Sequence, residues 1–281
     1  MRPMLVAALC ALASITACSH APQQPQPPEH SKAALLLEQS AAQPGTETRI
    51  GIQFVMDKDW HIYWLNPGDS GEPPVVHWQL PPGVTAAALE WPSPTRLSTT
   101  AGTDYGYQGN VVLLSTFTVS AATQPGTSLP IAATVNWLVC HDICIPQRAQ
   151  LDATLRVATP ATQDGNAHSL LTAAAQQIPT PLPASFHLAA SNSSANFRLS
   201  LIAPAAVASA IFFPANSGQI DNSAPQQLSV AGNTTRLELK KSDYLQHDPE
   251  RLQGLLVLNG KDSYQVDVPL RTSHAAKEKH P

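Results

Sequence analysis

The sequence predicts an all-β protein built from two antiparallel β-sandwich domains. The first observation behind this prediction is that short or alternating apolar segments recur between turn residues along the body of the chain. The second is the presence of 26 prolines, which interrupt helices and suit turns and strand edges. The third is length, because about 250 residues follow a proline-rich leader, enough for one large or two small domains.

The first predicted domain, residues 32–179, alternates strand-like segments with turn signals. The turn signals are Asn66-Pro67-Gly68, Pro82-Gly83 and Gln108-Gly109-Asn110. Short strands separated by turn residues in this way are typical of an antiparallel sandwich. We expect strands at Arg49–Met56, Val75–Leu80, Val111–Val119, Ile131–Val139 and Arg148–Val157.

The pattern changes between Pro160 and Pro183. Residues 168–177 predict a short helix, and the proline-rich segment 178–183 predicts a linker. Strand-like segments then resume, so we place a boundary near residue 180 and a second domain at 180–271. The polar tail 272–281 is expected to be disordered. The strands expected in the second domain are Phe197–Ile202, Ala208–Phe213, Gln227–Val230, Thr235–Leu239, Gly254–Leu258 and Tyr264–Leu270.

The N-terminus predicts export. Arg2 followed by the apolar stretch Met4–Leu12 is typical of a signal peptide and is too short to span a membrane. The stretch ends in Ile15-Thr16-Ala17-Cys18, which resembles a lipobox, so we expect cleavage after residue 17 and acylation of Cys18. The alternative is an ordinary signal peptide in which Cys18 is incidental. Cys10 lies in the part that is removed.

Residues 18–31 predict a tether. Proline at the density of Pro22–Pro28 favours extended polyproline II, and the 12 residues from Ser19 to His30 would reach about 37 Å. We expect a periplasmic body held on a membrane through the lipid at Cys18. Ser19 favours the inner face of the outer membrane, by resemblance to enterobacterial sorting signals. No later segment is apolar and long enough to predict a transmembrane helix.

Charge and motifs exclude several classes of function. The formal net charge is −4, and the chain contains no basic cluster, so nucleic acid is not an expected partner. The patterns GxxxxGK, GxGxxG, HExxH and GxSxG are absent, which removes the sequence signatures of P-loop, Rossmann, zinc-protease and α/β-hydrolase sites. Neither a cofactor nor a metal is required by the motifs that remain.

Cys140 and Cys144 are the only cysteines after the export region. They flank a connection between two predicted strands, and the chain must turn between them for the sulfurs to meet, because four extended residues span about 13 Å. Pro146 predicts an edge position for its strand. A disulfide that closes so short a loop stabilises the fold only weakly, since it restricts the unfolded chain little.

The chemistry of this loop leaves four interpretations open. In an oxidising compartment the two cysteines can form a structural disulfide or a pair that exchanges disulfides with other proteins. With His141 between them they can also bind a soft metal such as Cu(I) or Zn(II). The fourth interpretation is a pair of inert cysteines.

Several motifs together resemble a known family. They are Trp60–Gly71 (WHIYWLNPGDSG), Trp91–Pro94, Tyr105-Gly106-Tyr107, the Cys140–Pro146 loop, Phe212–Gln226 and Tyr264–Leu270. In this order they are similar to the N-terminal periplasmic region of DsbD-type thiol:disulfide interchange proteins, closest to the ScsB-like branch linked to copper tolerance. The resemblance extends over residues 32–271.

The resemblance implies two immunoglobulin-like sandwiches and a redox-active disulfide, Cys140–Cys144. In the family this pair receives electrons from a membrane-embedded transporter through a thioredoxin-like domain and reduces exported proteins. Neither of those domains is found in this chain, so we expect a separate donor, either thioredoxin-like or a DsbD/CcdA-type membrane protein. By the resemblance, Cys144 is the cysteine that joins the partner.

Neighbouring residues are expected to modulate this protein-disulfide reductase chemistry. His141 would stabilise a thiolate and Asp142 would oppose that effect. Tyr105 and Tyr107 either pack in the core or cover the disulfide as a lid, and the tryptophans Trp60, Trp64, Trp78 and Trp91 are expected to pack, as is Tyr63. The alternative function is a non-enzymatic periplasmic binding module with a structural disulfide, or a Cu(I)-binding protein.

Overall fold

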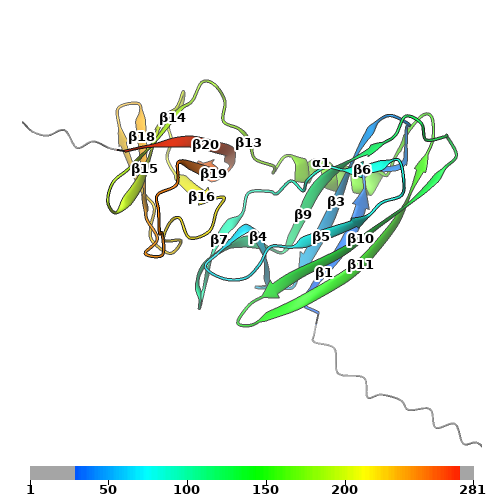
Figure 1. Cartoon of the computed structure of the whole chain (residues 1–281), viewed down its shortest axis with the longest axis horizontal. Helices are drawn as coiled ribbons and strands as arrows, with labels where there is room; N and C mark the ends of the chain where they lie inside the picture. Colours follow the sequence, from blue (N-terminus) through cyan, green and yellow to red (C-terminus); the bar gives the residue numbers. More distant parts are fainter. Residues whose placement is uncertain (1–28, 273–281) are drawn as a thin grey trace, which may run out of the picture.

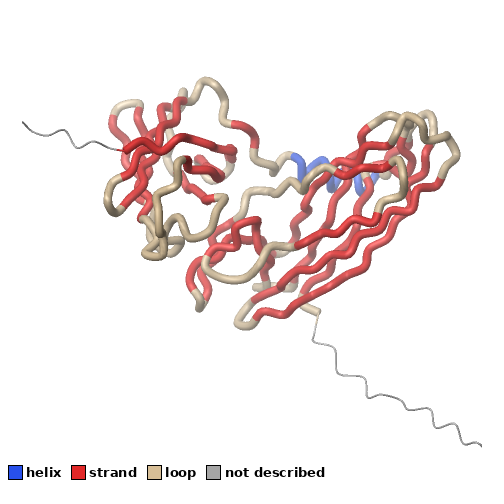
Figure 2. The backbone as a smooth tube through the Cα atoms, viewed as in Figure 1, coloured by secondary structure: helices blue, strands red, loops and turns tan. Residues whose placement is uncertain are grey.

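The structure is a computed structural model that describes residues 29–272 (Figure 1). The predicted signal peptide 1–17, the predicted lipidation site Cys18, most of the tether 18–31 and residues 273–281 of the tail lie outside the described residues. The anchor therefore stays a prediction. Strands dominate the described chain and the single α-helix is short, as Figure 2 shows.

Residues 31–163 form two sheets, which we call the N-terminal sandwich. The first sheet has the order β1-β3-β9-β6. Its strands are β1 (Ser31–Leu37), β3 (Glu47–Met56), β9 (Asn110–Val119) and β6 (Val84–Ala86). Apolar residues of both sheets enclose one core, with Ile52, Phe54 and Leu113 from the first sheet against Val135 and Trp137 from the second.

The second sheet has the order β12-β2-β11-β10-β4-β8-β7, with β5 also paired to β10. Its strands are β2 (Gln39–Ala42), β4 (His61–Gly68), β5 (Val75–Gln79), β7 (Thr95–Thr99), β8 (Gly102–Gln108), β10 (Ser128–Cys140), β11 (Cys144–Val157) and β12 (Thr162–Gln163). Strand β10 pairs with β5 along its middle, at 132–136, and with β4 only at Cys140. The end of β10 therefore meets a separate group of strands, β4, β8 and β7.

The helix α1 (Gly165–Ala175) covers the outer face of the first sheet. Leu171 is buried against Val112 and Leu114 of β9. The helix begins three residues before the predicted start, because the side chain of Asp164 accepts a hydrogen bond from the Ala167 amide (3.0 Å) and caps the first turn. The predicted helix is confirmed, with an earlier start.

Residues 180–272 form a third sheet, which we call the C-terminal sheet, of order β16-β19-β20-β14-β15-β18-β17, with β13 on β20. Its buried side chains, such as Phe197, Phe212 and Leu252, form a core of their own. The strands are β13 (Thr180–Pro181), β14 (His187–Asn192), β15 (Asn196–Ile202), β16 (Ala210–Pro214), β17 (Gln227–Ala231), β18 (Thr234–Lys240), β19 (Arg251–Leu258) and β20 (Asp262–Thr272).

The predicted fold class is confirmed, since the described chain is mostly β with sheets packed as sandwiches. Two details were wrong. Pairing is not purely antiparallel, because β2–β11, β13–β20 and β14–β20 are parallel. The predicted linker 178–183 contains β13, and its Thr180 pairs with Tyr264 in β20.

The segment Asn66-Pro67-Gly68, predicted as a turn between strands, is instead the irregular end of β4. The register of β4 against β8 shifts between Tyr63 and Gly68. Asn66 is buried, its Nδ2 donates a hydrogen bond to the Pro214 carbonyl (2.8 Å), and its Oδ1 accepts one from the Gly68 amide (3.1 Å). The local sequence could not reveal this, because Pro214 lies in the C-terminal sheet.

Phe213 of β16 joins the C-terminal sheet to the N-terminal sandwich. Its ring lies edge-on to Trp64 and Tyr105, with centroids 6.2 Å and 5.1 Å away, and it belongs to the core of the sandwich. Polar contacts continue the junction: the Tyr105 hydroxyl donates to Asn222 Oδ1 (2.8 Å), and Asn222 Nδ2 donates to Asp69 Oδ1 (2.8 Å). The connection between β16 and β17, which carries Asn222, is therefore hydrogen-bonded to the loop that begins at Asp69.

Candidate functional site at the tip of the β10–β11 hairpin

Cys140 and Cys144 form a disulfide at the end of a long hairpin. Strands β10 and β11 pair without a register shift from Ser128–Arg156 to Cys140–Cys144, so the two cysteines face each other across the last pair of the ladder. The chain turns at His141, whose amide donates to the Ile143 carbonyl (3.1 Å). The predicted turn between the cysteines is confirmed.

Pro146 fits the edge position predicted for it. Strand β11 pairs with β10 on one side, and on the other side only Arg156 and Val157 pair, with β2. The cysteine end of β11 is therefore an open edge. A proline there removes no hydrogen bond that another strand would use.

The two cysteines differ in exposure. Cys140 is 1% exposed and counts among the buried core residues, whereas Cys144 is exposed. Ile143, which precedes Cys144, is 65% exposed and presents an apolar side chain at the tip of the loop. Cys144 is therefore the cysteine of the pair that lies at the surface, while Cys140 is shielded by protein.

Strand pairing decides which side chains surround the disulfide. Cys140 lies directly opposite His61 of β4, and directly opposed residues project from the same face of a sheet. Alternation along β4 places Tyr63 on that face too, and the Tyr63 hydroxyl lies 3.6 Å from Cys144 Sγ. A disulfide sulfur carries no proton, so the tyrosine is the donor.

Tyr63 is fully buried beneath the loop that follows Asp69. A Cβ atom added at Gly71 would lie 2.0 Å from the Tyr63 ring, and Gly71 has a φ of +77°, so only glycine suits this close approach. Burial raises the pKa of the Tyr63 hydroxyl, a hydrogen bond with Ser70 lowers it, and the Asp104 carboxylate raises it, with a net rise. The hydroxyl therefore stays protonated at neutral pH and remains a donor.

A buried polar network continues from Tyr63 towards His61. The Ser70 hydroxyl lies 2.9 Å from both carboxylate oxygens of Asp104, and the Ser70 amide donates to Oδ1 (3.0 Å). Asp104 is 1% exposed, and its Oδ2 lies 3.6 Å from Nε2 of His61, which is 4% exposed. The disulfide thus lies beside a tyrosine, a carboxylate and a histidine, which sequence reasoning had not assigned to the site.

Tyr105 and Tyr107 do not form the lid that one interpretation predicted. Tyr107 lies opposite Ile62 in the β4–β8 ladder, so it projects from the face opposite to His61 and Tyr63. The Tyr107 hydroxyl donates to the Pro92 carbonyl (2.7 Å), and the Tyr105 hydroxyl is bonded at the junction with the C-terminal sheet. Burial raises the pKa of both hydroxyl groups, which accords with their packing in the core.

His141 and Asp142 lie at the exposed end of the loop. His141 Nδ1 is 3.0 Å from the Asp142 carboxylate, and the His141 ring is tilted against Trp60, with centroids 5.9 Å apart. Trp60 in turn stacks on His30 at 3.8 Å. Their predicted influence on a thiolate at the disulfide stays a prediction. Within residues 29–272, no group of three or more His, Cys, Asp or Glu side chains is placed to hold a metal ion.

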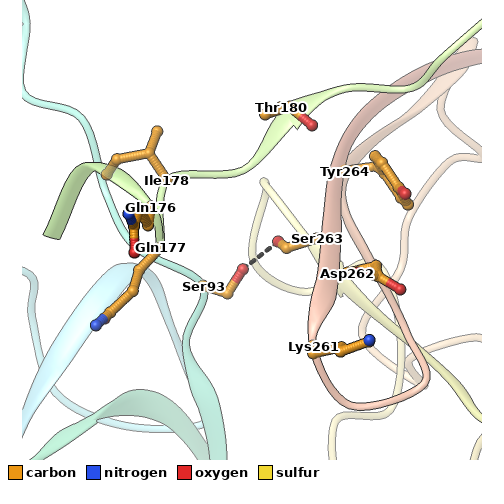
Figure 3. Close-up of a pocket in the computed structure, with 9 residues that line it drawn as sticks. All are labelled: Ser93, Gln176, Gln177, Ile178, Thr180, Lys261, Asp262, Ser263 and Tyr264. Carbon is orange, nitrogen blue, oxygen red and sulfur yellow. Dashed lines mark hydrogen bonds between the residues drawn. The ribbon is translucent and has the colours of Figure 1, made fainter. Parts of the chain in front are cut away.

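Two surface cavities bear on where exchange chemistry can take place. A cavity of about 610 Å³ adjoins the hairpin tip and is lined by residues that include His61, Arg96, Gln108 and His141. Another, of about 370 Å³, lies between the end of α1 and the β19–β20 turn, where Ser93 and Ser263 are hydrogen-bonded (Figure 3). Its lining contains no cysteine or histidine, so it is not a site for exchange chemistry.

In the described part of the chain, no helix has the length and apolar character needed to cross a membrane.

Comparison with curated protein sequences yields no match. Among solved structures, the N-terminal periplasmic domain of ScsB from Proteus mirabilis superposes with a TM-score of 0.66 at 15% identity, covering 87% of this chain and 94% of that one. The major pilin subunit BcpA of Bacillus cereus reaches only 0.30 at 8% identity, covering 87% and 70%.

The likeness to the ScsB domain shows a shared fold for nearly the whole described chain. The family model described as "Thiol:disulfide interchange protein DsbD, N-terminal" matches residues 32–156, which include the N-terminal sandwich up to β11 and both cysteines of the hairpin. The part of the chain that carries the Cys140–Cys144 disulfide therefore belongs to the DsbD N-terminal family of thiol:disulfide interchange proteins.

Proposed function

We propose that this protein is a periplasmic disulfide reductase module in which Cys144 exchanges with partner proteins and Cys140 resolves the mixed disulfide. Membership of the DsbD N-terminal family supports thiol–disulfide exchange in general. The observation that carries the specific assignment is the unequal exposure of the two cysteine residues, with Cys144 exposed and Cys140 1% exposed. Only an accessible sulfur can meet the sulfur of another protein in line.

The proposed reaction has two steps. The Cys144 thiolate attacks a disulfide in an exported protein, which forms a mixed disulfide and releases one thiolate of the target. The Cys140 thiolate then attacks Cys144 Sγ, which forms the Cys140–Cys144 disulfide and releases the second target thiolate. The target gains two electrons and the hairpin loses two. A separate dithiol donor, thioredoxin-like or carried by a membrane protein, reverses these steps to restore the reduced hairpin.

The location belongs to the same proposal. Lipidation at Cys18 would hold the protein at a membrane through the proline-rich tether, and Ser19 favours the inner face of the outer membrane. The resemblance to the ScsB-like branch supports exported proteins damaged under copper or oxidative stress as targets.

The test of the proposal is reduction of the oxidised protein by a reduced thioredoxin-like protein in native buffer. We expect the Cys140–Cys144 bond to be reduced in a second-order reaction while the circular dichroism of the protein is unchanged. Reduction only after addition of denaturant would mean that the disulfide is a structural staple and would overturn the proposal.

Tyr63→Phe should slow exchange at Cys144 without unfolding the protein. The substitution removes the hydroxyl that lies 3.6 Å from Cys144 Sγ, and a hydrogen bond to a charged group contributes about 1.5–3 kcal/mol. We therefore expect about a 10- to 100-fold slower reaction of the Cys144 thiolate near pH 7. Stopped-flow measurement of mixed-disulfide formation checks this value.

Tyr107→Phe is the matched control for that measurement. It also removes a buried hydroxyl, but one that is bonded to Pro92 on the opposite face of the sheet. We expect this variant to lose about 1 kcal/mol of stability and to exchange at the wild-type rate. Equal slowing in both variants would show that the effect of Tyr63 is not due to its contact with Cys144.

A further inference from the structure

His61 lies beside the disulfide, and the proposed exchange steps assign it no role. It lies directly opposite Cys140 in the β4–β10 ladder, where the Cβ atoms of opposed residues are about 4.5–5.5 Å apart. Its side chain is 5% exposed, and its Nε2 atom is buried without a hydrogen-bond partner. A buried polar atom with no partner is unusual and calls for a physical reason.

Reduction of the disulfide leaves a negative charge on the sulfur of Cys140, which a neighbouring histidine would neutralise. When a donor thiolate attacks Cys144, the bond to Cys140 breaks and the electron pair leaves on Cys140 Sγ. That sulfur belongs to a residue that is 1% exposed, and burial of an unpaired charge is strongly unfavourable. The leaving sulfur therefore requires a proton or a positive charge from a neighbour within the protein.

We propose that His61, supported by Asp104, is the proton donor and acceptor for the buried sulfur of Cys140. In the reductive direction, the His61 imidazolium gives its proton to the Cys140 thiolate as the bond to Cys144 breaks, leaving a neutral imidazole and a thiol. In the oxidative direction, the neutral imidazole takes that proton back, and the Cys140 thiolate attacks Cys144. The inference rests on the proposed exchange function.

The groups around His61 suit this role. Asp104 Oδ2 lies 3.6 Å from His61 Nε2, and the hydrogen bonds from the Ser70 amide and hydroxyl hold the carboxylate in place. The Tyr63 ring lies edge-on to the imidazole at 5.1 Å. The cavity on the other side, of about 610 Å³, connects His61 to solvent. Its other charged or titratable lining residues are Asp59, Arg96, His141 and Asp142.

The experiment measures the rate of disulfide reduction by dithiothreitol as a function of pH, divided by the fraction of dithiothreitol present as thiolate. For the wild-type protein we expect an inflection that reports protonation of one group of the protein. His61→Gln should remove this inflection and lower the rate near pH 7 by at least about 100-fold. His77→Gln is the matched control, because His77 is exposed on β5 of the same sheet, and it should leave the profile unchanged.

A second measurement uses the Cys144→Ala background, in which Cys140 is a single thiol. The ultraviolet absorbance of the Cys140 thiolate should appear at higher pH when His61→Gln is added. Near-ultraviolet circular dichroism shows whether each variant is folded. If His61→Gln does not fold, Asp104→Asn takes its place, and it should displace the inflection of the wild-type profile.

The outcomes separate this inference from the proposed function. A wild-type disulfide that dithiothreitol reduces only after unfolding overturns both. Rapid reduction of the wild-type protein, with the same pH profile in His61→Gln or, failing that, in Asp104→Asn, leaves the exchange function intact and overturns the role of His61.

Discussion

Cys144→Ser is expected to abolish exchange, with a fall in rate of at least about 1,000-fold, the size of effect seen when a nucleophile is removed. The reason is geometric, because the remaining sulfur of Cys140 is 1% exposed and cannot meet a partner. The fold should survive. A disulfide that closes so short a loop contributes about 2 kcal/mol in the chain-entropy model. Reduction of a target disulfide by the pre-reduced variant measures the rate.

Cys140→Ser is the matched variant, and its expected result is different. Cys144 can still attack, but no second thiol resolves the product, so a mixed disulfide with the target should accumulate and be visible by mass spectrometry. The same adduct on Cys140 in the Cys144→Ser protein, or equal rates in the two variants, would contradict the assignment of roles.

Phe213→Ala is expected to destabilise the protein by about 3–5 kcal/mol, the usual effect of emptying a buried phenylalanine site. Phe213 is 2% exposed and fills the space between Trp64 and Tyr105, so its removal leaves a cavity at the junction of the N-terminal sandwich and the C-terminal sheet. Urea unfolding of the oxidised protein measures this free energy.

Ile211→Ala is the control for that prediction. Ile211 lies on the same strand, β16, but is 37% exposed, so its truncation creates no closed cavity and should change the free energy of unfolding by less than about 1 kcal/mol. Equal losses in the two variants would show that Phe213 does not join the two parts of the fold. A loss below about 1 kcal/mol for Phe213→Ala would show the same.

Local sequence patterns predicted much of the fold. The alternation in 131–139 and 148–157 identified the hairpin that carries the cysteines, and the structure extends the two strands to Cys140 and from Cys144. Alternation of apolar and polar residues is a local pattern, and both strands have one buried face. The sequence alone therefore predicts these two strands. Short strands such as β6 and β13 carry too few residues for a period to be seen.

The surroundings of the disulfide were much less predictable. His61 and Tyr63 approach the cysteines only because β4 pairs with the last residue of β10, at Cys140. That pairing joins segments about 80 residues apart, and one sequence contains no signal for the register between them. The motif WHIYWLNPG carried the family resemblance, but it did not say which of its aromatic side chains points at the sulfur.

The lid interpretation of Tyr105 and Tyr107 failed for a related reason. Alternation along β8 places these tyrosines on one face and Asp104 and Gly106 on the other, but all four residues are buried. When both faces of a strand are covered, hydrophobic alternation no longer tells which face meets the core. The face becomes known only from the pairing of Tyr107 with Ile62.

The equilibrium reduction potential of the Cys140–Cys144 bond is the measurement that tests exchange most directly. Equilibration of the protein with a series of reduced and oxidised glutathione mixtures, read by mass spectrometry after thiol trapping, gives the value. The exposed Cys144 and the short loop predict a potential above about −300 mV, with equilibrium reached from both the oxidised and the reduced protein. A potential well below about −300 mV together with slow exchange would identify a structural staple and contradict the proposed function.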